Sequence, residues 1–455
     1  MSTVLAAPPP ARPAGPRSRI PFQALLRFRR GAPDYLQQIA REYGPVSFFY
    51  LGKQRMYFVT DPEVIKDVLV TSQSKFRKSR MLQRAKVLLG EGLLTSEGAF
   101  HLRQRRLAQP AFHRDRLRGY GQSMIDYGVR SRDRWQPGET LDIATEMMRL
   151  TLAVVAKTLF NADVDADAGV IGQSLGTVLE LFDTVLLPFS EYLEKLPLPF
   201  VKRFERSRDT LDAIIYRIIQ ERRQQPESDH GDLLSMLLMA KDEDGSGGMS
   251  DTQVRDEALT IFLAGHETTA VALTWTFYLL SQNPESEVRL VAELDRVLDG
   301  RLPTFDDLPA LKYVEQVFAE GMRLYPPAWA IGRMAAEPYT MPAPYNWEVE
   351  PGAMILMSTY VSHRDPKYFP DPERFDPDRW LPEHAERRPK FSYFPFGGGT
   401  RVCIGERFAW MEGILLLAVI LQQWKLTLDP AQVVDKRALL TMRPKFGMRM
   451  RVERR

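Results

Sequence analysis

Cysteine is almost absent from this chain, because Cys403 is the only one in 455 residues. A single cysteine excludes an internal disulfide framework and any zinc or iron–sulfur site that is built from cysteines alone. Scarce cysteine is also typical of a reducing compartment, so we expect a cytoplasmic protein. The surroundings of the one retained cysteine are therefore the first place to look for chemistry.

Long apolar runs are missing as well. The most apolar stretch begins at Gly413 and ends at Trp424, and it is shorter than the ~20 residues that a helix needs to cross a bilayer. Residues 1–19 are rich in proline and lack the apolar core of a signal peptide. We therefore predict no transmembrane anchor, a disordered arm over residues 1–19 and one domain over residues 20–455.

The chain has no large surplus of charge of one sign. Its 61 basic and 58 acidic residues give a formal net charge of +3, which is too small to indicate nucleic-acid binding. The sequence also lacks a C-x-x-C cluster and a G-x-G-x-x-G fingerprint for dinucleotides. These absences argue against a nucleic-acid partner and against a built-in dinucleotide-binding unit.

Apolar residues recur at helical spacing through much of the chain. This spacing predicts helices over residues 32–43, 99–111, 146–160, 201–224, 251–281 and 407–423. Alternation of apolar and polar residues is sparse, and it predicts short strands within residues 45–60, 347–359 and 446–453. The pattern indicates a mainly α single domain with small β-sheets at its margins.

The cysteine follows three glycines in the stretch FPFGGGTRVCIG, and a predicted helix begins near Glu406. Free N–H groups and the positive end of the helix dipole favour a thiolate there and lower its pKa. A thiolate at such a place suits nucleophilic catalysis or metal ligation. The alternative is a buried, inert cysteine, which is the common fate of a lone one.

A second motif, AGHETT, covers Ala264 to Thr269 inside the longest predicted helix. Gly265 costs about 1 kcal/mol relative to alanine in a helix interior, and Thr268 and Thr269 can divert hydrogen bonds from the helix backbone. The motif predicts a locally opened helix with room for a small ligand. The alternative is a helix-packing contact with a solvated Glu267.

Two further groups of charged residues have ordinary alternatives. Glu320 and Arg323 share one helix face, and Arg374 follows in a proline-rich loop. They form either a buried cluster that anchors the loop or an exposed pair of small effect. His101 and Arg105 share a face of another predicted helix, which is otherwise explained as a solvated basic surface.

The order and spacing of these motifs together resemble the cytochrome P450 family from about Ile20 onward. The cysteine stretch resembles that family's haem-binding loop F-x-x-G-x-R-x-C-x-G, through Phe396, Gly399, Arg401, Cys403 and Gly405. AGHETT resembles its oxygen-activation helix, and the Glu320, Arg323 and Arg374 set resembles its structural triad. The resemblance implies a mostly helical, triangular fold with haem b between the long helix and the cysteine helix.

The resemblance also implies roles for single residues. Cys403 would be the iron ligand, with Phe396 and Gly405 beside it, while Thr268 and Glu267 would be catalytic through the supply of protons. The haem propionates would pair with four residues, which are His101, Arg105, Arg333 and Arg401. Many members carry tryptophan where this chain has His101, but an imidazole can donate the same hydrogen bond.

The implied substrate is lipophilic. Ala264 would face it above the iron, and the pocket wall would include Ala328, Trp329 and Ile331. The apolar segment 179–200 falls where the family's entrance helices lie. We expect a fatty acid, a terpenoid or a carotenoid-like molecule to receive one oxygen atom from O2. A peroxide-driven hydroxylase and a non-catalytic haem-thiolate gas sensor are the alternatives.

Electrons are expected from a separate protein, because too few residues follow the cysteine helix for a reductase domain. A ferredoxin or flavodoxin with its NAD(P)H reductase would fit this need. The expected docking surface is basic, and it would combine Arg103, Arg106, Arg387, Arg388 and Lys390.

Overall fold

The computed structural model describes residues 12–17, 23–161, 170, 172–174, 176–178, 196, 198–224, 231–241 and 247–455. The chain forms two compact units, each assembled from separate stretches. The sheet unit comprises residues 1–79, 329–372 and 388–402, and the helical unit comprises residues 80–328, 373–387 and 403–455. No helix in the described ranges is long and apolar enough to span a membrane.

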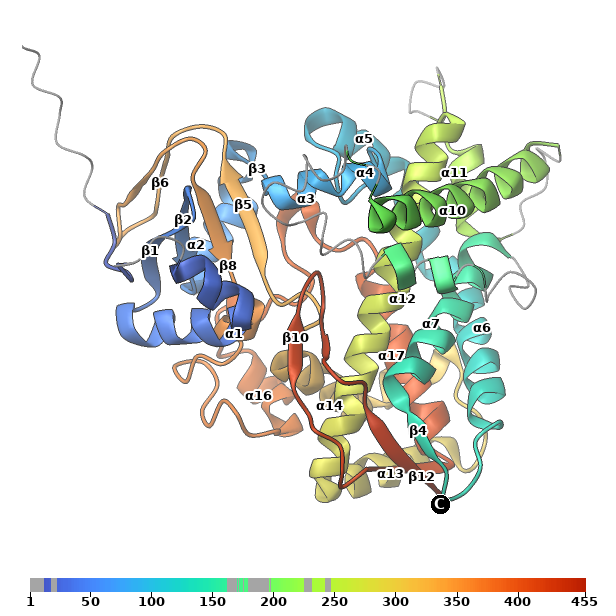
Figure 1. Ribbon diagram of the computed structural model, residues 1–455. Coiled ribbons are helices and arrows are strands. Elements are labelled where there is room, and N and C mark those ends of the chain that lie inside the picture. The colour runs from blue at the N-terminus through green and yellow to red at the C-terminus, as the bar shows by residue number, and fades with distance from the viewer. Residues whose placement is uncertain are drawn as a thin grey trace, which may run out of the picture. The chain divides into compact units, whose positions relative to one another are not determined.

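The sheet unit is built on five strands in the order β1-β2-β8-β5-β3. Neighbouring strands run antiparallel except for β2 and β8, which are parallel. The bounds are β1 (Val46–Leu51), β2 (Gln54–Val59), β3 (Phe76–Lys78), β5 (Ile331–Ala335) and β8 (Met354–Met357). Helix α1 (Gln23–Tyr43) lies beside β1 (Figure 1).

The smaller elements of the sheet unit complete its core. Their bounds are α2 (Pro62–Lys66), β6 (Tyr339–Thr340), β7 (Glu348–Val349) and α15 (Thr359–Ser362). Buried apolar side chains from β2, α2 and β8 pack together, among them Tyr57, Ile65 and Ile355. Such residues bury apolar area that drives the folding of the unit.

Residues 12–17 belong to the segment predicted as a disordered arm, yet they pack on β1. Ala14 O accepts the Phe48 N–H at 3.1 Å. The Arg12 guanidinium lies 4.5 Å from the centre of the Phe48 ring and 3.0 Å from the Glu350 carboxylate. These contacts order the described part of the arm, because a cation, a ring and a carboxylate hold it at the sheet edge.

Long helices fill the helical unit. In its described part the longer ones are α5 (Gly98–Ala108), α6 (Arg114–Arg132), α7 (Ile143–Phe160), α10 (Pro199–Arg223), α12 (Asp251–Gln282), α13 (Pro284–Leu298), α14 (Lys312–Leu324) and α17 (Glu406–Leu421). The shorter ones are α3 (Arg80–Arg84), α4 (Lys86–Leu89), α11 (Leu233–Met239) and α16 (Pro382–Ala385).

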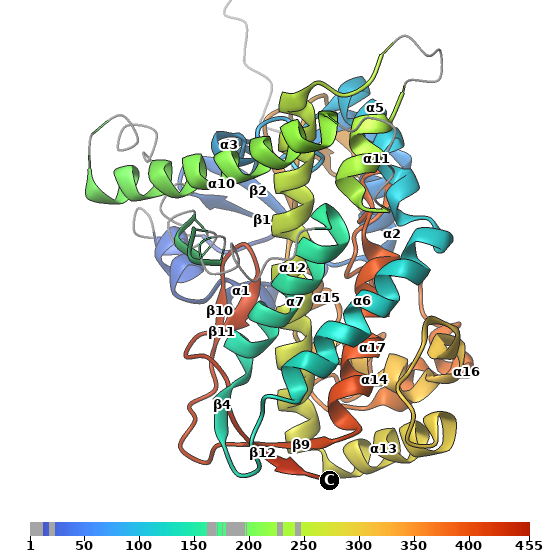
Figure 2. The ribbon, with the colours of Figure 1, turned by 90° about the vertical axis from the view of Figure 1, so that its right-hand side faces the viewer.

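Helix α12 is the centre of this unit. Ser250 and Gln253 form a capping box at its start, and Asn283 with Pro284 ends it. Helices α7, α14 and α17 all pack against it, and Figure 2 shows α7 and α12 side by side. Helix α17 is buried from Met411 to Leu421 and apolar there except at Glu412, as expected for a helix surrounded by others.

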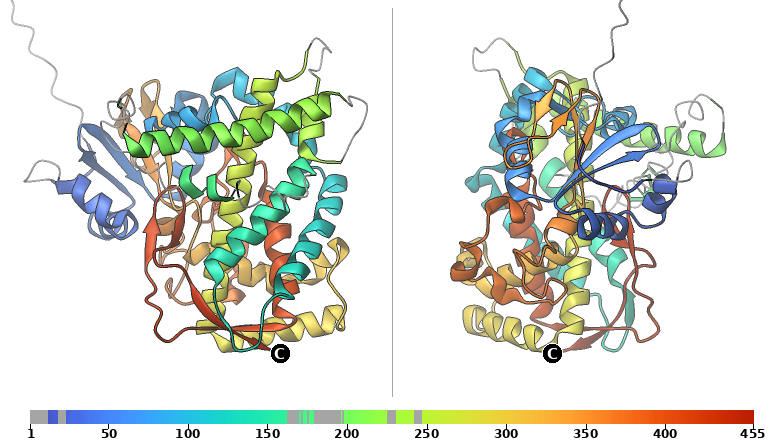
Figure 3. Two further views of the ribbon diagram at one scale, coloured as in Figure 1. Left: turned by 45° about the vertical axis from the view of Figure 1, so that its right-hand side comes forward. Right: turned by 90° about the vertical axis from the view of Figure 1, so that its left-hand side faces the viewer.

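Short strands close the helical unit. Strands β4 (Thr140–Asp142), β12 (Arg449–Arg454) and β9 (Trp424–Leu428) form one sheet. This sheet lies beside the carboxyl-terminal end of α12 (Figure 3). Strands β10 (Lys436–Ala438) and β11 (Met442–Pro444) form an antiparallel hairpin, and this hairpin contacts α12 through β11.

The predicted mainly α fold with small sheets is confirmed, and each predicted helix and strand region contains the expected element. Helix α1 begins earlier than predicted. Gly31 and Pro33 lie at a kink within it, and in the sequence these two residues indicate a loop before a shorter helix. Helices α6 and α13 are missing from the sequence-based assignment. The apolar segment 179–200 lies outside the described residues.

Candidate active site

Cys403 lies in the turn that precedes α17, and Gly405 caps that helix. The Cys403 side chain is exposed. The surrounding protein nevertheless desolvates the sulfur, and this raises the pKa of the thiol to about 11. The Gly405 N–H and the Arg105 charge lower this pKa, and Glu406 raises it. The prediction that the thiol pKa is lowered is therefore wrong for the protein without a bound metal. Desolvation of the sulfur raises the pKa by more than the N–H group at the start of the helix lowers it.

One stretch of α12 is open although the residues before and after it are buried. Ala264 is exposed, and Thr268 is half-buried one turn later. Thr268 Oγ1 donates to Ala264 O at 2.8 Å, and Thr269 Oγ1 donates to Gly265 O at 3.3 Å. The helix runs through these residues without a break. The predicted opening of the helix is therefore wrong, and the hydroxyls bind the carbonyls of an intact helix.

Gly265 lets helix α7 approach α12 closely. A Cβ atom at this position would lie 3.2 Å from Val155 Cγ2 on α7. Thr151 Oγ1 of α7 also donates to His266 O at 2.9 Å. The glycine thus serves the packing of α7, while the accessible part of α12 belongs to Ala264 and Thr268.

Glu267 is buried, which excludes the alternative of a solvated carboxylate. Thr441 Oγ1 donates to its Oε1 at 2.6 Å, and the Arg443 guanidinium lies 2.9 Å from the same oxygen. The neighbouring His266 is buried with Nδ1 3.2 Å from Phe262 O. Burial lowers the pKa of His266, so Arg443 supplies the positive charge beside Glu267.

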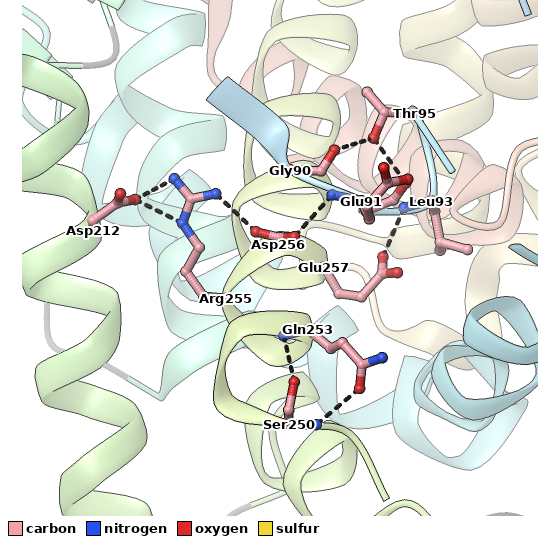
Figure 4. A network of polar contacts seen from close by, with 11 residues as sticks. Gly90, Glu91, Leu93, Thr95, Asp212, Ser250, Gln253, Arg255, Asp256 and Glu257 are labelled. Carbon is pink, nitrogen blue, oxygen red and sulfur yellow. Dashed lines mark hydrogen bonds and ion pairs between the residues drawn. The ribbon is translucent and has the colours of Figure 1, made fainter. Parts of the chain in front are cut away.

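Further polar contacts fix the amino-terminal half of α12 (Figure 4). The Arg255 guanidinium donates to Asp212 of α10 at 2.7 Å and to Asp256 at 2.9 Å. Asp256 in turn accepts the Glu91 N–H at 2.8 Å. A chain of charges thus joins α10, α12 and the loop before α5, and it holds that loop on α12.

Helix α5 carries the two predicted propionate partners of the helical unit. His101 is buried, and its Nδ1 lies 3.3 Å from Ser96 Oγ. Arg105 is half-buried, and burial lowers its pKa while the Cys403 charge raises it. The guanidinium is therefore close enough to the cysteine to interact with it electrostatically.

The other predicted cofactor contacts belong to the sheet unit. Arg333 is half-buried on β5, opposite Lys78 of β3 and Ile355 of β8. Phe396 and Arg401 are also half-buried. Their roles stay predictions.

The predicted pocket residues are placed in different ways. Ala328 is exposed, whereas Trp329 is buried with its ring 6.3 Å from the Phe28 ring. Ile331 is half-buried and packs on the core of the sheet unit. A place in the pocket wall stays a prediction for Ala328, Trp329 and Ile331.

Comparison with known proteins decides the family. The cytochrome P450 family model matches residues 13–448. The chain belongs to the cytochrome P450 family. It is 39% identical over 401 residues to cyclooctatin synthase of Streptomyces melanosporofaciens, which covers 88% of this chain and 87% of that protein. It is 36% identical over 425 residues to pentalenene oxygenase of Streptomyces avermitilis, with 93% of each chain covered. Carotene epsilon-monooxygenase of Arabidopsis thaliana is 33% identical over 445 residues, 91% of this chain and 80% of that protein.

This P450 is accordingly a monooxygenase that acts on a lipophilic substrate and needs O2 and a redox partner. Cytochromes P450 hold their haem through a cysteine thiolate. The helical unit fits such a group, because Cys403 is accessible ahead of α17 and α12 is accessible at Ala264. The exposed residue at position 264 is a small alanine, and Arg105 offers a cation for the haem carboxylates.

Glu320 and Arg323 of the P450 form a buried ion pair on α14, and neither side chain is exposed. Arg323 Nε and Nη2 donate to the two carboxylate oxygens, both at 2.8 Å. Glu320 also accepts the Asp376 N–H at 3.0 Å and the Trp380 Nε1–H at 3.1 Å. The cluster therefore anchors the loop that follows position 370, as the sequence predicts.

The third member of this cluster is a different arginine from the predicted one. Arg374 has an exposed side chain and contributes only its carbonyl, which accepts from Arg323 Nη2 at 3.0 Å. Arg379 is buried and lies 3.4 Å from the Glu320 carboxylate. It belongs to a short 3-10 helix over Pro377–Trp380. The structure thus replaces Arg374 by Arg379, because that turn directs the later side chain inward.

Sequence reasoning also missed an acid on α17. Glu412 is fully buried, and neither carboxylate oxygen accepts a hydrogen bond of normal geometry within the described residues. Burial raises its pKa to about 8, and the Thr269 hydroxyl acts in the opposite direction. The carboxyl is therefore protonated at neutral pH. A single acid in the apolar run FAWMEGILLL is the signal that could have found it.

Proposed function

We propose that this P450 inserts one oxygen atom from O2 into a cyclic terpenoid and uses haem b as its cofactor. The accessible Ala264 and Thr268 on the otherwise buried α12 carry this proposal, because they offer a substrate and oxygen site. The relatives named cyclooctatin synthase and pentalenene oxygenase support the substrate class. The second oxygen atom leaves as water, which consumes two electrons and two protons in each turnover.

Three residues of the helical unit would bind the cofactor. When bound, the haem supplies the activation of O2. Cys403 would hold the iron as a thiolate, and the positive iron would offset the desolvation that raises the thiol pKa. Arg105 would bind a propionate through its planar guanidinium, and His101 would donate a second hydrogen bond.

Proton supply falls to Glu267 and Thr268. The Thr268 hydroxyl donates to Ala264 O in the accessible stretch, and with the haem bound it would be the proton donor of that stretch. Glu267 stands next to it in the chain and is the nearest acid on the same helix turn. A carboxyl and a hydroxyl in sequence can pass a proton from solvent to the reacting oxygen. A gas sensor needs no such relay.

Electrons would arrive from a ferredoxin or flavodoxin and its NAD(P)H reductase. Arg106 is exposed on α5, and Arg103 is half-buried there with Nη2 3.3 Å from Gly248 O. Helix α5 also carries Arg105, which interacts with Cys403. An acidic carrier that docks on this helix would therefore approach the cysteine side of the cofactor.

The substrate class can be tested by binding. Cyclic terpene hydrocarbons and alcohols should shift the Soret band of the purified ferric protein as they displace water from the iron. Saturated fatty acids of similar carbon number are the matched comparison, and turnover under labelled O2 should place one label in the product. A shift with fatty acids alone would overturn the terpenoid proposal, and the formation of neither labelled product nor labelled water would point to the gas-sensor alternative.

Replacement of Thr268 by alanine should separate binding from proton supply. Substrate-induced spectra should persist, but product per NAD(P)H should fall about tenfold as reducing equivalents go to peroxide or water. Thr274→Ala is the control, because Thr274 Oγ1 makes the same kind of bond, to Ala270 O at 2.7 Å, in a buried part of α12. Parent-level coupling in Thr268→Ala would remove Thr268 from the mechanism.

A further inference from the structure

A strand far from α12 in the sequence holds the acid of the motif AGHETT. Thr441, directly before strand β11, and Arg443 within it both contact the same Glu267 oxygen, at 2.6 Å and 2.9 Å. The two residues are two positions apart where the chain enters the strand, so both side chains reach the carboxylate together. An oxygen that accepts from a hydroxyl and forms an ion pair with a guanidinium is held in one position.

The backbone between these two residues is tied to α12 itself. Trp275 Nε1 of α12 donates to Met442 O at 2.8 Å, and Met442 N donates to Pro327 O at 2.9 Å. The Trp275 ring stacks on Tyr325 with the centres 3.9 Å apart. The Trp275 hydrogen bond therefore ties β11 to the helix that carries Glu267, and the segment after α14 supports this contact through the Pro327 carbonyl and the Tyr325 ring.

Exposure differs sharply along this contact. The Glu267 side chain is 2% exposed, whereas that of Arg443 is 31% exposed. The Arg443 side chain thus contacts the buried acid and is also partly exposed to solvent. It is a partly exposed partner of a carboxylate that is itself buried.

We propose that Arg443 and Thr441 are positioning residues. They hold the Glu267 carboxylate beside the partly exposed Arg443 side chain, and there the carboxylate takes up the protons used in oxygen activation. This inference rests on the proposed role of Glu267 as the proton donor. A proton passes from water to the Glu267 carboxylate and then to the Thr268 hydroxyl, which hands on its own proton, so no charge accumulates on the relay. Arg443 itself neither gains nor loses a proton.

Removal of the guanidinium should change the acid in a way that can be measured without turnover. Among the described residues, Arg443 of β11 is the cation paired with Glu267, and burial keeps the neighbouring His266 ring neutral. Without Arg443 the buried carboxylate has no cation partner among these residues, and it should take up a proton at neutral pH. Infrared spectra should then show a new protonated carboxyl band.

The experiment uses Arg443→Gln in the haem-loaded protein with its redox partner. We expect Arg443→Gln to show the new infrared band and about a tenfold lower yield of product per NAD(P)H. The band should be absent from the double variant that also carries Glu267→Gln. Peroxide-driven turnover should stay near the parent level, because peroxide brings its own protons. Arg443→Lys should restore the carboxylate and most of the coupling, since it keeps a cation at the site.

Arg437→Gln is the matched control, because Arg437 is exposed and pairs directly with Arg443 across the hairpin. It should change neither the infrared band nor the yield of product per NAD(P)H, which is the coupling.

If Thr268→Ala lowers the coupling while Arg443→Gln keeps the parent coupling and shows no new band, the positioning role is wrong and the proposed function stands. If Glu267→Gln and Thr268→Ala both keep parent coupling, the proton relay itself is wrong. Poor haem loading of Arg443→Gln that Arg443→Lys does not repair would assign Arg443 to folding and overturn the inference.

Discussion

Cys403→Ser should abolish the thiolate signature and the monooxygenase activity together. The ferrous carbon monoxide complex of the parent should show the strongly red-shifted Soret band of a thiolate ligand. Serine has nearly the shape of cysteine, but its hydroxyl is a hard and weakly acidic ligand, so it cannot donate charge to the iron as sulfur does. Because no other cysteine exists in the chain, no second thiol can take over.

A second variant separates the loss of haem from the loss of the thiolate. Cys403→His should retain more haem than Cys403→Ser, since imidazole is a common iron ligand, but its carbon monoxide complex should lack the red-shifted band. Haem content is measured after extraction, and the band is measured in the ferrous complex. A red-shifted band that persists in Cys403→Ser would overturn the assignment of Cys403 as the ligand.

Local signals account for what the sequence predicts well. The start and end of α12 are encoded within a few residues, by Ser250 with Gln253 and by Asn283 with Pro284. The turn before α17 is encoded in the same local way by glycines. Cys403, Ala264 and Thr268 could therefore be placed on their elements from neighbouring residues alone, and the structure places each of them there.

Contacts between distant segments account for most of what the sequence does not predict. Glu267 is held by Thr441 and Arg443, more than 170 positions later in the chain, and neither residue type suggests this by itself. The pKa of Cys403 depends on how closely protein surrounds the sulfur, which the helix end alone does not reveal. Helix α6 is hidden for a local reason, because glycines and arginines interrupt its apolar face.

The choice between Arg374 and Arg379 shows the same limit on a small scale. The loop contains two similar stretches, DPERF and DPDRW, and each offers an arginine after a proline. Only the second forms a 3-10 helix whose cap, Asp376, donates its N–H to Glu320. The sequence shows both candidates, but only the packing of the loop on α14 selects one of them.

Arg323→Ala should strand the Glu320 carboxylate in the core of the helical unit. Both side chains are fully buried and joined by two hydrogen bonds of 2.8 Å. Loss of one partner from a buried ion pair costs about 3–5 kcal/mol, which is a large part of the ~5–15 kcal/mol that stabilises a typical domain. We expect a much lower yield of folded, haem-loaded protein and a lower midpoint of denaturant unfolding, with little change in substrate preference of the remaining enzyme.

The two arginines of the loop provide the matched comparison. Arg379→Ala should destabilise the protein in the same direction as Arg323→Ala, because it removes a buried cation 3.4 Å from the Glu320 carboxylate. Arg374→Ala should leave the free energy of unfolding within about 0.5 kcal/mol of the parent, since its side chain is exposed and only its backbone carbonyl enters the cluster. Equal effects of the two loop variants would contradict the assignment of Arg379, and a stable, fully loaded Arg323→Ala would show that Glu320 is satisfied by its N–H donors alone.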